Sequence, residues 1–178
     1  MTNIIFLFGT FAGLIVIAGI IGTIVAAGGS PNMSDHNLWL GYLIMFVALS
    51  MIFFGVKRYR DQDLGGVIKF LPAFLMGLGI AIVAGIIYVL VWEVYMAATN
   101  YTFMDVYVTA VLDAERAKGT SPDKIAAMAK ELEYYRVHYK DPLFRMPLTF
   151  LEIFPVGLLI ALFSAALLQF PRVLPARA

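Results

Sequence analysis

The chain has 178 residues, of which 61% are hydrophobic and 14% are charged, whereas a soluble globular domain carries about 25% charged residues. The net charge of +1, with no basic stripe along the chain, argues against a protein that binds nucleic acid. Cysteine is absent, which excludes structural disulfides and thiolate metal sites. The composition therefore predicts a protein that resides in a lipid bilayer.

Four long apolar windows predict four membrane-spanning helices. A helix needs roughly 20 mainly apolar residues to cross a bilayer, and the windows that meet this requirement are about 4–27, 38–56, 70–96 and 148–170. The first window is longer than the apolar part of a signal peptide, and the preceding "MTN" carries no Lys or Arg. We therefore expect this window to remain in the protein as a membrane-spanning helix. We therefore expect an all-α membrane protein that forms a single membrane domain over residues 1–178.

Small residues recur along these windows at the spacing of helix contacts. They are Gly9 and Gly13, Ala18 and Gly22, and Gly77, Ala81 and Gly85. Such residues let helix backbones approach closely in a membrane. We expect them to pack the spans against each other, and the use of one such row in a homodimer stays open.

Positive charge is unevenly distributed between the short loops. Basic residues follow the second window, at Lys57, Arg58, Arg60 and Lys69, and the C-terminal tail adds Arg172 and Arg177. The loop "GGSPNMSDHN" after the first window has none. Because Lys-rich and Arg-rich loops stay in the cytoplasm, we expect a multi-pass protein of the cell inner membrane with both termini cytoplasmic. The four loop cations could also bind anionic lipid headgroups, although their effect on orientation is the simpler account.

The segment between the third and fourth windows predicts an amphipathic helical hairpin over about 102–140, outside the cytoplasm. Thr102 begins a stretch with apolar residues at helical spacing, and Gly119 ends it. Ser121 and Pro122 are typical first residues of a second helix. The apolar faces of the hairpin would bury against each other, the membrane surface or the mouths of the spans. The hairpin would then act either as a packed cap or as an arm that binds a partner.

Two carboxylates interrupt the predicted spans near the same membrane surface. Glu93 lies close to the end of the third window, and Glu152 lies on the order of 8 Å inside the fourth, which runs in the opposite direction. Acids in a span usually face the bundle interior or water. One interpretation is a proton or cation site made by both acids. The other is a structural role in which an acid pairs with Arg145, Arg116 or Lys140 and fixes how the hairpin docks.

Pro155 follows Glu152 by one helical turn and completes the candidate polar intramembrane site of Glu152, Glu93 and Pro155. A proline inside a helix leaves the carbonyl of Leu151 without its helical donor and bends the helix. Interrupted backbone beside a carboxylate is one way in which membrane proteins build polar pockets. A kink with no further role is the alternative.

Two blocks of the sequence carry a family resemblance, "FFGVKRYRDQDLGGVIKFLPAFLMGLGIAIVAGIIYVLVWE" and "YKDPLFRMPLTFLEIFPVGLLIALFSAALL". The matching residues are Gly55, Lys57, Tyr59, Arg60, Asp61, Gly65, Gly66, Glu152, Phe154, Pro155 and Gly157. In these blocks the sequence resembles a bacterial family of small integral membrane proteins known as domain of unknown function 4199. The resemblance implies four spans with a helical insert before the last one, and it transfers no activity.

No hydrolase, nucleotide-binding or zinc-binding motif is present in the sequence. We therefore expect no enzyme, no cofactor and no metal site. The expected function is that of a non-enzymatic inner-membrane scaffold, accessory subunit or envelope regulator. Its expected partners are membrane lipids and, through the 102–140 hairpin, a second copy or another membrane protein, with no nucleic acid. The alternative is a small oligomeric transporter or channel that uses Glu152 with Glu93 as a proton or cation site.

Overall fold

The computed structural model describes residues 1–28 and 35–170, with side chains described in the second range from Trp39 onward. The C-terminal tail cations Arg172 and Arg177, which contribute to the predicted orientation, lie outside the described residues. Seven helices and no strand occur in the described part, namely α1 (Thr2–Ala26), α2 (Asp35–Leu49), α3 (Met51–Asp63), α4 (Phe70–Ala98), α5 (Phe103–Ala117), α6 (Pro122–His138) and α7 (Pro142–Leu168).

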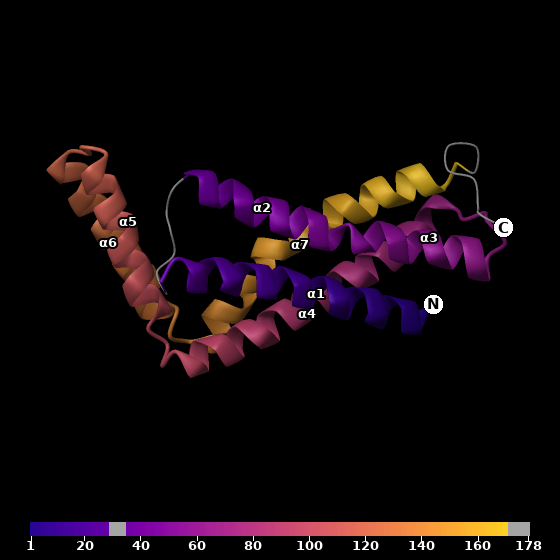
Figure 1. The fold of residues 1–178 in the computed structure, drawn as a ribbon, viewed down its shortest axis with the longest axis horizontal. Helices are drawn as coiled ribbons and strands as arrows, with labels where there is room; N and C mark the ends of the chain where they lie inside the picture. The colour runs from indigo at the N-terminus through magenta and orange to yellow at the C-terminus, as the bar shows by residue number, and fades with distance from the viewer. Residues whose placement is uncertain (29–34, 171–178) are drawn as a thin grey trace.

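Within the described residues, four segments are long and apolar enough to cross a membrane. They are α1, the continuous stretch Trp39–Asp63 formed by α2 and α3, α4, and α7. These segments lie side by side as an elongated bundle, while α5 and α6 pack on each other and stand at one end of it (Figure 1). The expected all-α fold with four spans and a helical hairpin before the last one is confirmed.

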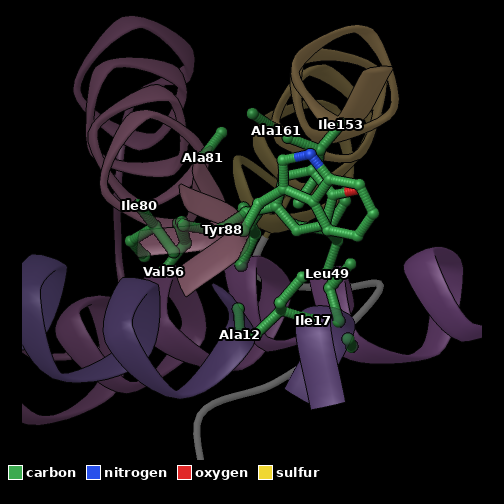
Figure 2. Packing of buried hydrophobic residues seen from close by; sticks show 14 of the residues in the cluster. Ala12, Ile17, Leu49, Val56, Ile80, Ala81, Tyr88, Ile153 and Ala161 are labelled. Atoms are coloured by element: carbon green, nitrogen blue, oxygen red, sulfur yellow. The ribbon is translucent and has the colours of Figure 1, made fainter. Parts of the chain in front are cut away.

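Helix α4 is the central element of the bundle. It packs along most of its length against α7 and α1, and α3 contacts both α7 and α1. The buried residues between these helices form a continuous apolar core, in which Ala81 and Tyr88 of α4 lie near Ile153 and Ala161 of α7 (Figure 2). Large apolar side chains also cover the outside of the spans, with Phe163 68% exposed. A helix that is apolar on all sides is the expected solution when the surrounding medium is lipid.

Glycines allow this close packing. A Cβ atom on Gly13 would lie 2.6 Å from the carbonyl oxygen of Ala84, and one on Gly157 would lie 2.9 Å from the Cβ of Ala81. A Cβ atom on Gly22 would meet no other atom within 4 Å. Gly13 therefore packs α1 on α4 as expected, whereas Gly22 faces open space in the single chain.

The helices of the second and fourth spans extend beyond the predicted windows. Helix α3 continues through Lys57 to Asp63, because charged side chains can leave the membrane while their backbone stays helical. Helix α7 begins at Pro142, six residues before the predicted window, where Asp141 accepts a hydrogen bond of 2.9 Å from the backbone N–H of Leu143. A proline at the first position and an aspartate cap are both typical of a helix start.

The hairpin has the predicted helix ends. Helix α5 begins after Thr102, Gly119 has a φ of 77°, and α6 begins at Pro122 after Ser121. The Ser121 hydroxyl makes no capping hydrogen bond, so the proline and the backbone geometry define this start. No residue of α6 is fully buried. The hairpin is therefore anchored at its base and exposed along most of its length.

Candidate polar site at the hairpin end of the bundle

Arg145 is the residue around which the hairpin end of the bundle is built. Its side chain has no exposed surface. Its Nε and Nη2 atoms donate to the two carboxylate oxygens of Glu93 at 2.7 and 2.5 Å, the paired geometry that makes Arg–carboxylate contacts strong. Nη1 donates to the backbone carbonyls of Tyr139 at 2.6 Å and Lys140 at 3.3 Å. One guanidinium thus joins α4, α7 and the end of the hairpin.

The turn between α4 and α5 places an aromatic ring beside this guanidinium. Asn100 and Tyr101 have φ values of 52° and 57°, a left-handed conformation that costs on the order of 1–3 kcal/mol for each residue. The Tyr101 ring centre lies 5.1 Å from Cζ of Arg145, and that of Tyr139 lies 5.8 Å away. Both distances are within the range of cation–π attraction. The surrounding contacts therefore hold the strained turn in place.

Trp92 connects α4 to both helices of the hairpin. Its Nε1 donates to the hydroxyl of Tyr139 at 3.0 Å, and its ring packs edge-on against Phe103 of α5 with centroids 4.8 Å apart. Burial raises the pKa of the Tyr139 phenol above its usual value, and the nearby Glu152 carboxylate acts in the same direction. We call Trp92, Glu93, Tyr101, Tyr139 and Arg145 the hairpin base.

Glu152 lies about two helical turns further along α7 than Arg145, deeper in the predicted span. Its Oε2 accepts a hydrogen bond of 3.1 Å from the hydroxyl of Tyr88, which is 3% exposed. Glu152 as a whole residue is exposed in the single chain, and it forms no ion pair with a described residue. Burial raises the pKa of Tyr107 in α5, and the charge of Glu152 acts in the same direction.

The two acids of the candidate site thus lie on the same α4–α7 interface with separate partners. Of the three cations considered from the sequence, Glu93 pairs with Arg145, which lies in the first turn of α7 and not in the hairpin. Arg116 pairs instead with Asp113 of its own helix at 2.6 Å, and Lys140 contributes its backbone carbonyl. Glu93 therefore has a cation of α7 as its partner, and Glu152 has no cation beside it among the described residues.

Pro155 adds no polar group to this site. Helix α7 continues through Pro155 without interruption, and the residue lies on the exposed side of the helix. The backbone thus stays helical, while the missing N–H of Pro155 still leaves the carbonyl of Leu151 without its helical donor. A role of this position in a polar site stays a prediction.

One known protein family matches nearly the whole chain, including all or most of each helix in the described residues. A family described as "Protein of unknown function (DUF4199)" matches residues 7–169. The chain belongs to this family. No curated protein and no solved structure matches the sequence. The resemblance inferred from the two sequence blocks is confirmed, and this DUF4199 protein is a multi-pass, all-helical membrane protein.

A second polar cluster lies at the opposite end of the DUF4199 bundle, where the sequence predicted lipid-headgroup binding or orientation by Lys57, Arg58, Arg60 and Lys69. Arg60 has no exposed surface, lies 2.6 Å from Asp61, and approaches the carbonyl of Leu168 at 3.5 Å. Lys57 also pairs with Asp61. Arg60 thus links α3 to the C-terminal end of α7, where a cation is favourable. Headgroup binding by this cluster stays a prediction.

Sequence reasoning missed the neutral partners of the polar site. The sequence patterns single out neither Tyr88 nor Tyr139. Their residue type could have indicated such a role, because buried Tyr and Trp side chains usually need a partner for their O–H or N–H group. Tyr88 lies inside the third span, where its hydroxyl could reach neither water nor a headgroup, so a polar residue on a neighbouring helix was to be expected.

Proposed function

We propose that this DUF4199 protein is a non-enzymatic membrane scaffold whose four spans anchor the α5–α6 hairpin as a docking surface for another membrane protein. We place it in a bacterial inner membrane, with the hairpin on the non-cytoplasmic side. The observation that carries the proposal is the contact of buried Arg145 with Glu93 and with the carbonyls of Tyr139 and Lys140. It fixes the base of an otherwise exposed arm.

A fixed arm suits a docking function because little further ordering is needed when a partner binds. Ion pairs within the hairpin add to its order, with Arg136 2.8 Å from Glu133 and 3.4 Å from Asp105 of the other helix. Surface pairs contribute little individually to stability, so we take the hairpin base as the main support. Exposed Lys124, Lys130 and Glu131 then offer a charged surface to a partner.

Site-specific cross-linking tests this proposal. A photoreactive residue is placed at Lys124 or Lys130 on the hairpin, and at Phe163 on the lipid-facing side of α7 as the control. In native membranes we expect the hairpin positions to yield one reproducible protein product, identified by mass spectrometry, and the Phe163 position to yield none of it. Hairpin positions that give no product above the Phe163 control, in a correctly inserted protein, contradict the docking function.

Transport of a proton or a cation is the second candidate function. It is favoured by Glu152, whose carboxylate lies within a span with Tyr88 as its hydrogen-bond partner and with no described cation beside it. Flux is measured in proteoliposomes with the parent protein, Glu152→Gln and the hairpin control Glu131→Gln. A transporter loses most of its flux in Glu152→Gln and keeps it in Glu131→Gln. Equal flux in all three, or none in the parent, rules this function out.

A further inference from the structure

A cavity of about 320 Å³ opens at the junction between the hairpin and the spans. We call it the junction cavity, and its lining residues are Asn100, Tyr101, Asp105, Lys140, Pro142 and Arg145. Its volume is at the lower end of the range of about 300–1,000 Å³ that is usual for small-molecule sites. A ligand of the size of a lipid headgroup therefore suits it better than a large substrate.

The junction cavity lies at the level expected for lipid headgroups. Arg145 forms part of its wall, and Leu168, whose carbonyl Arg60 approaches, lies at the other end of α7. The two residues are separated by roughly 34 Å along an ideal helix, slightly more than the hydrocarbon thickness of about 30 Å. The two buried arginines thus mark the two ends of the hydrocarbon region, and the cavity opens at one of them.

One side of the cavity, formed by Arg145 and the turn at Asn100 and Tyr101, is held in place before a ligand enters. Arg145 already donates to Glu93 and to two backbone carbonyls, so its charge is balanced and its direction is set. Asn100 and Tyr101 hold their left-handed turn beside it. A site whose shape is fixed in advance loses less entropy on binding.

Three polar side chains around the cavity are available to a ligand. Lys140 forms no ion pair with a carboxylate among the described residues, and the side-chain amide of Asn100 makes no hydrogen bond there. Asp105 meets Arg136 only at 3.4 Å, because Arg136 is held more closely by Glu133 at 2.8 Å. The cavity therefore presents one cation, one amide and one loosely engaged carboxylate.

We propose that the junction cavity binds the headgroup of a phospholipid that carries both a phosphate and a primary ammonium group, as in phosphatidylethanolamine. The phosphate accepts hydrogen bonds from Lys140 and from the Asn100 amide, and the ammonium donates to Asp105. Hydrogen bonds between charged groups are the strong ones. Phosphatidylcholine fits less well, because its trimethylated ammonium has no N–H to donate to Asp105. Phosphatidylglycerol also fits less well, because its headgroup has no amine and would leave Asp105 facing a phosphate.

Lipid retention by the purified full-length protein tests this assignment. Native mass spectrometry compares phosphatidylethanolamine, phosphatidylglycerol and phosphatidylcholine with the same acyl chains. We expect preferential retention of phosphatidylethanolamine, and about tenfold weaker binding of it in Lys140→Gln, as for the loss of one charged hydrogen bond. Asp105→Asn should abolish the preference over phosphatidylglycerol. Asp123→Asn, at an exposed position of α6, should bind like the parent.

Asn100→Asp provides a second variant, because aspartate tolerates the left-handed turn while it places a negative charge beside the phosphate. It too should weaken binding. Equal retention of the three lipids, or binding that Lys140→Gln and Asn100→Asp leave unchanged in folded protein, overturns the proposal. Tighter binding of phosphatidylglycerol than phosphatidylethanolamine would assign an anionic lipid instead. Competition by soluble phosphoethanolamine at the same concentration would assign a free solute and contradict a lipid site.

Discussion

Buried cations are the residues that most clearly determine the ends of this bundle. Arg60 and Arg145 both have no exposed surface, and each lies beside a carboxylate. A buried charge is tolerated only when it is paired and hydrogen-bonded. The partner of Arg60 is its neighbour Asp61, whereas the partner of Arg145 lies on another helix. The ion pair of Arg145 with Glu93 therefore joins two helices, whereas that of Arg60 with Asp61 is local, and Arg60 reaches α7 only through the carbonyl of Leu168.

We predict that Glu93→Gln destabilises the protein more than Arg145→Met does. Glu93→Gln leaves a fully buried guanidinium without its counterion, which costs about 3 kcal/mol in the free energy of unfolding. Arg145→Met leaves Glu93, whose side chain is 18% exposed and can reach solvent. The free energy of unfolding of each variant is measured in mixed micelles, with the loss of helix followed by circular dichroism. Losses no larger than in the exposed control Glu131→Gln would show that the pair contributes nothing.

We also predict that the hairpin base loosens in alkali. Burial raises the pKa values of Tyr139 and Tyr107 in the folded protein, so the folded state retains their protons when the unfolded state has lost them. Their contribution to stability is complete below about pH 10 and decreases as the pH rises above it. Fluorescence of Trp92 in a Trp39→Phe background reports the change.

Tyr139→Phe should weaken this pH dependence, because the residue that replaces the phenol cannot ionise. The matched control is Tyr134→Phe, since the Tyr134 side chain is 54% exposed. An alkaline transition that is the same in Tyr139→Phe as in Tyr134→Phe would mean that the buried phenol does not cause it.

At the scale of elements, the approach of α1 and α7 to α4 depends on positions without side chains. Gly13 and Gly157 each leave room for a neighbouring helix, and a Cβ atom on Gly13 would overlap backbone that cannot move aside. Such contacts hold membrane bundles together because lipid gives helices little hydrophobic reason to associate. Periodicity predicted the candidate glycines, and the structure distinguishes those in contact from those facing outward.

We predict opposite outcomes for two alanine substitutions in α1. Gly13→Ala forces α1 away from the carbonyl of Ala84 and should cost about 1–3 kcal/mol of stability, as in other overpacked interiors. Gly22→Ala meets no atom within 4 Å and should be neutral or slightly stabilising, because alanine favours the helix. Thermal unfolding in detergent compares the two. Equal melting temperatures would contradict the close α1–α4 contact, and a loss confined to Gly22→Ala would point to an interface between copies.

For the whole molecule, an even number of spans places the start of α1 and the end of α7 at the same end of the bundle (Figure 1). The hairpin stands at the opposite end, with α5 and α6 packed on each other. The membrane sidedness of these two ends is part of the proposed function, and it rests on the loop cations after the second span.

Cysteine labelling measures that sidedness directly, because the natural sequence has no cysteine. We predict that a membrane-impermeant maleimide labels Lys124→Cys, on the hairpin, in intact cells. Gln62→Cys, at the end of α3, should react only after the cells are permeabilised, and it is the internal control. Labelling of Gln62→Cys but not Lys124→Cys in intact cells would reverse the orientation and place the hairpin in the cytoplasm.

The sequence by itself determined the elements of this protein. Apolar length determined the four spans, and Gly119, Ser121 and Pro122 determined where the hairpin turns, because these features depend on consecutive residues. Sequence also identified Glu93 and Glu152 as acids within spans. It left Arg145, Arg116 and Lys140 as equal candidates to pair with them, and it gave no role to Tyr88.

Only the tertiary structure decided which polar groups meet. Arg145 and Glu93 are 52 residues apart in the chain, and Tyr88 and Glu152 are 64 apart. Their contacts depend on how far α4 and α7 slide along each other, and the packing of small residues such as Gly157 against Ala81 sets that register. A shift of one turn, about 5.4 Å, would give each acid a different neighbour, while the hydrophobic pattern of both helices would remain the same.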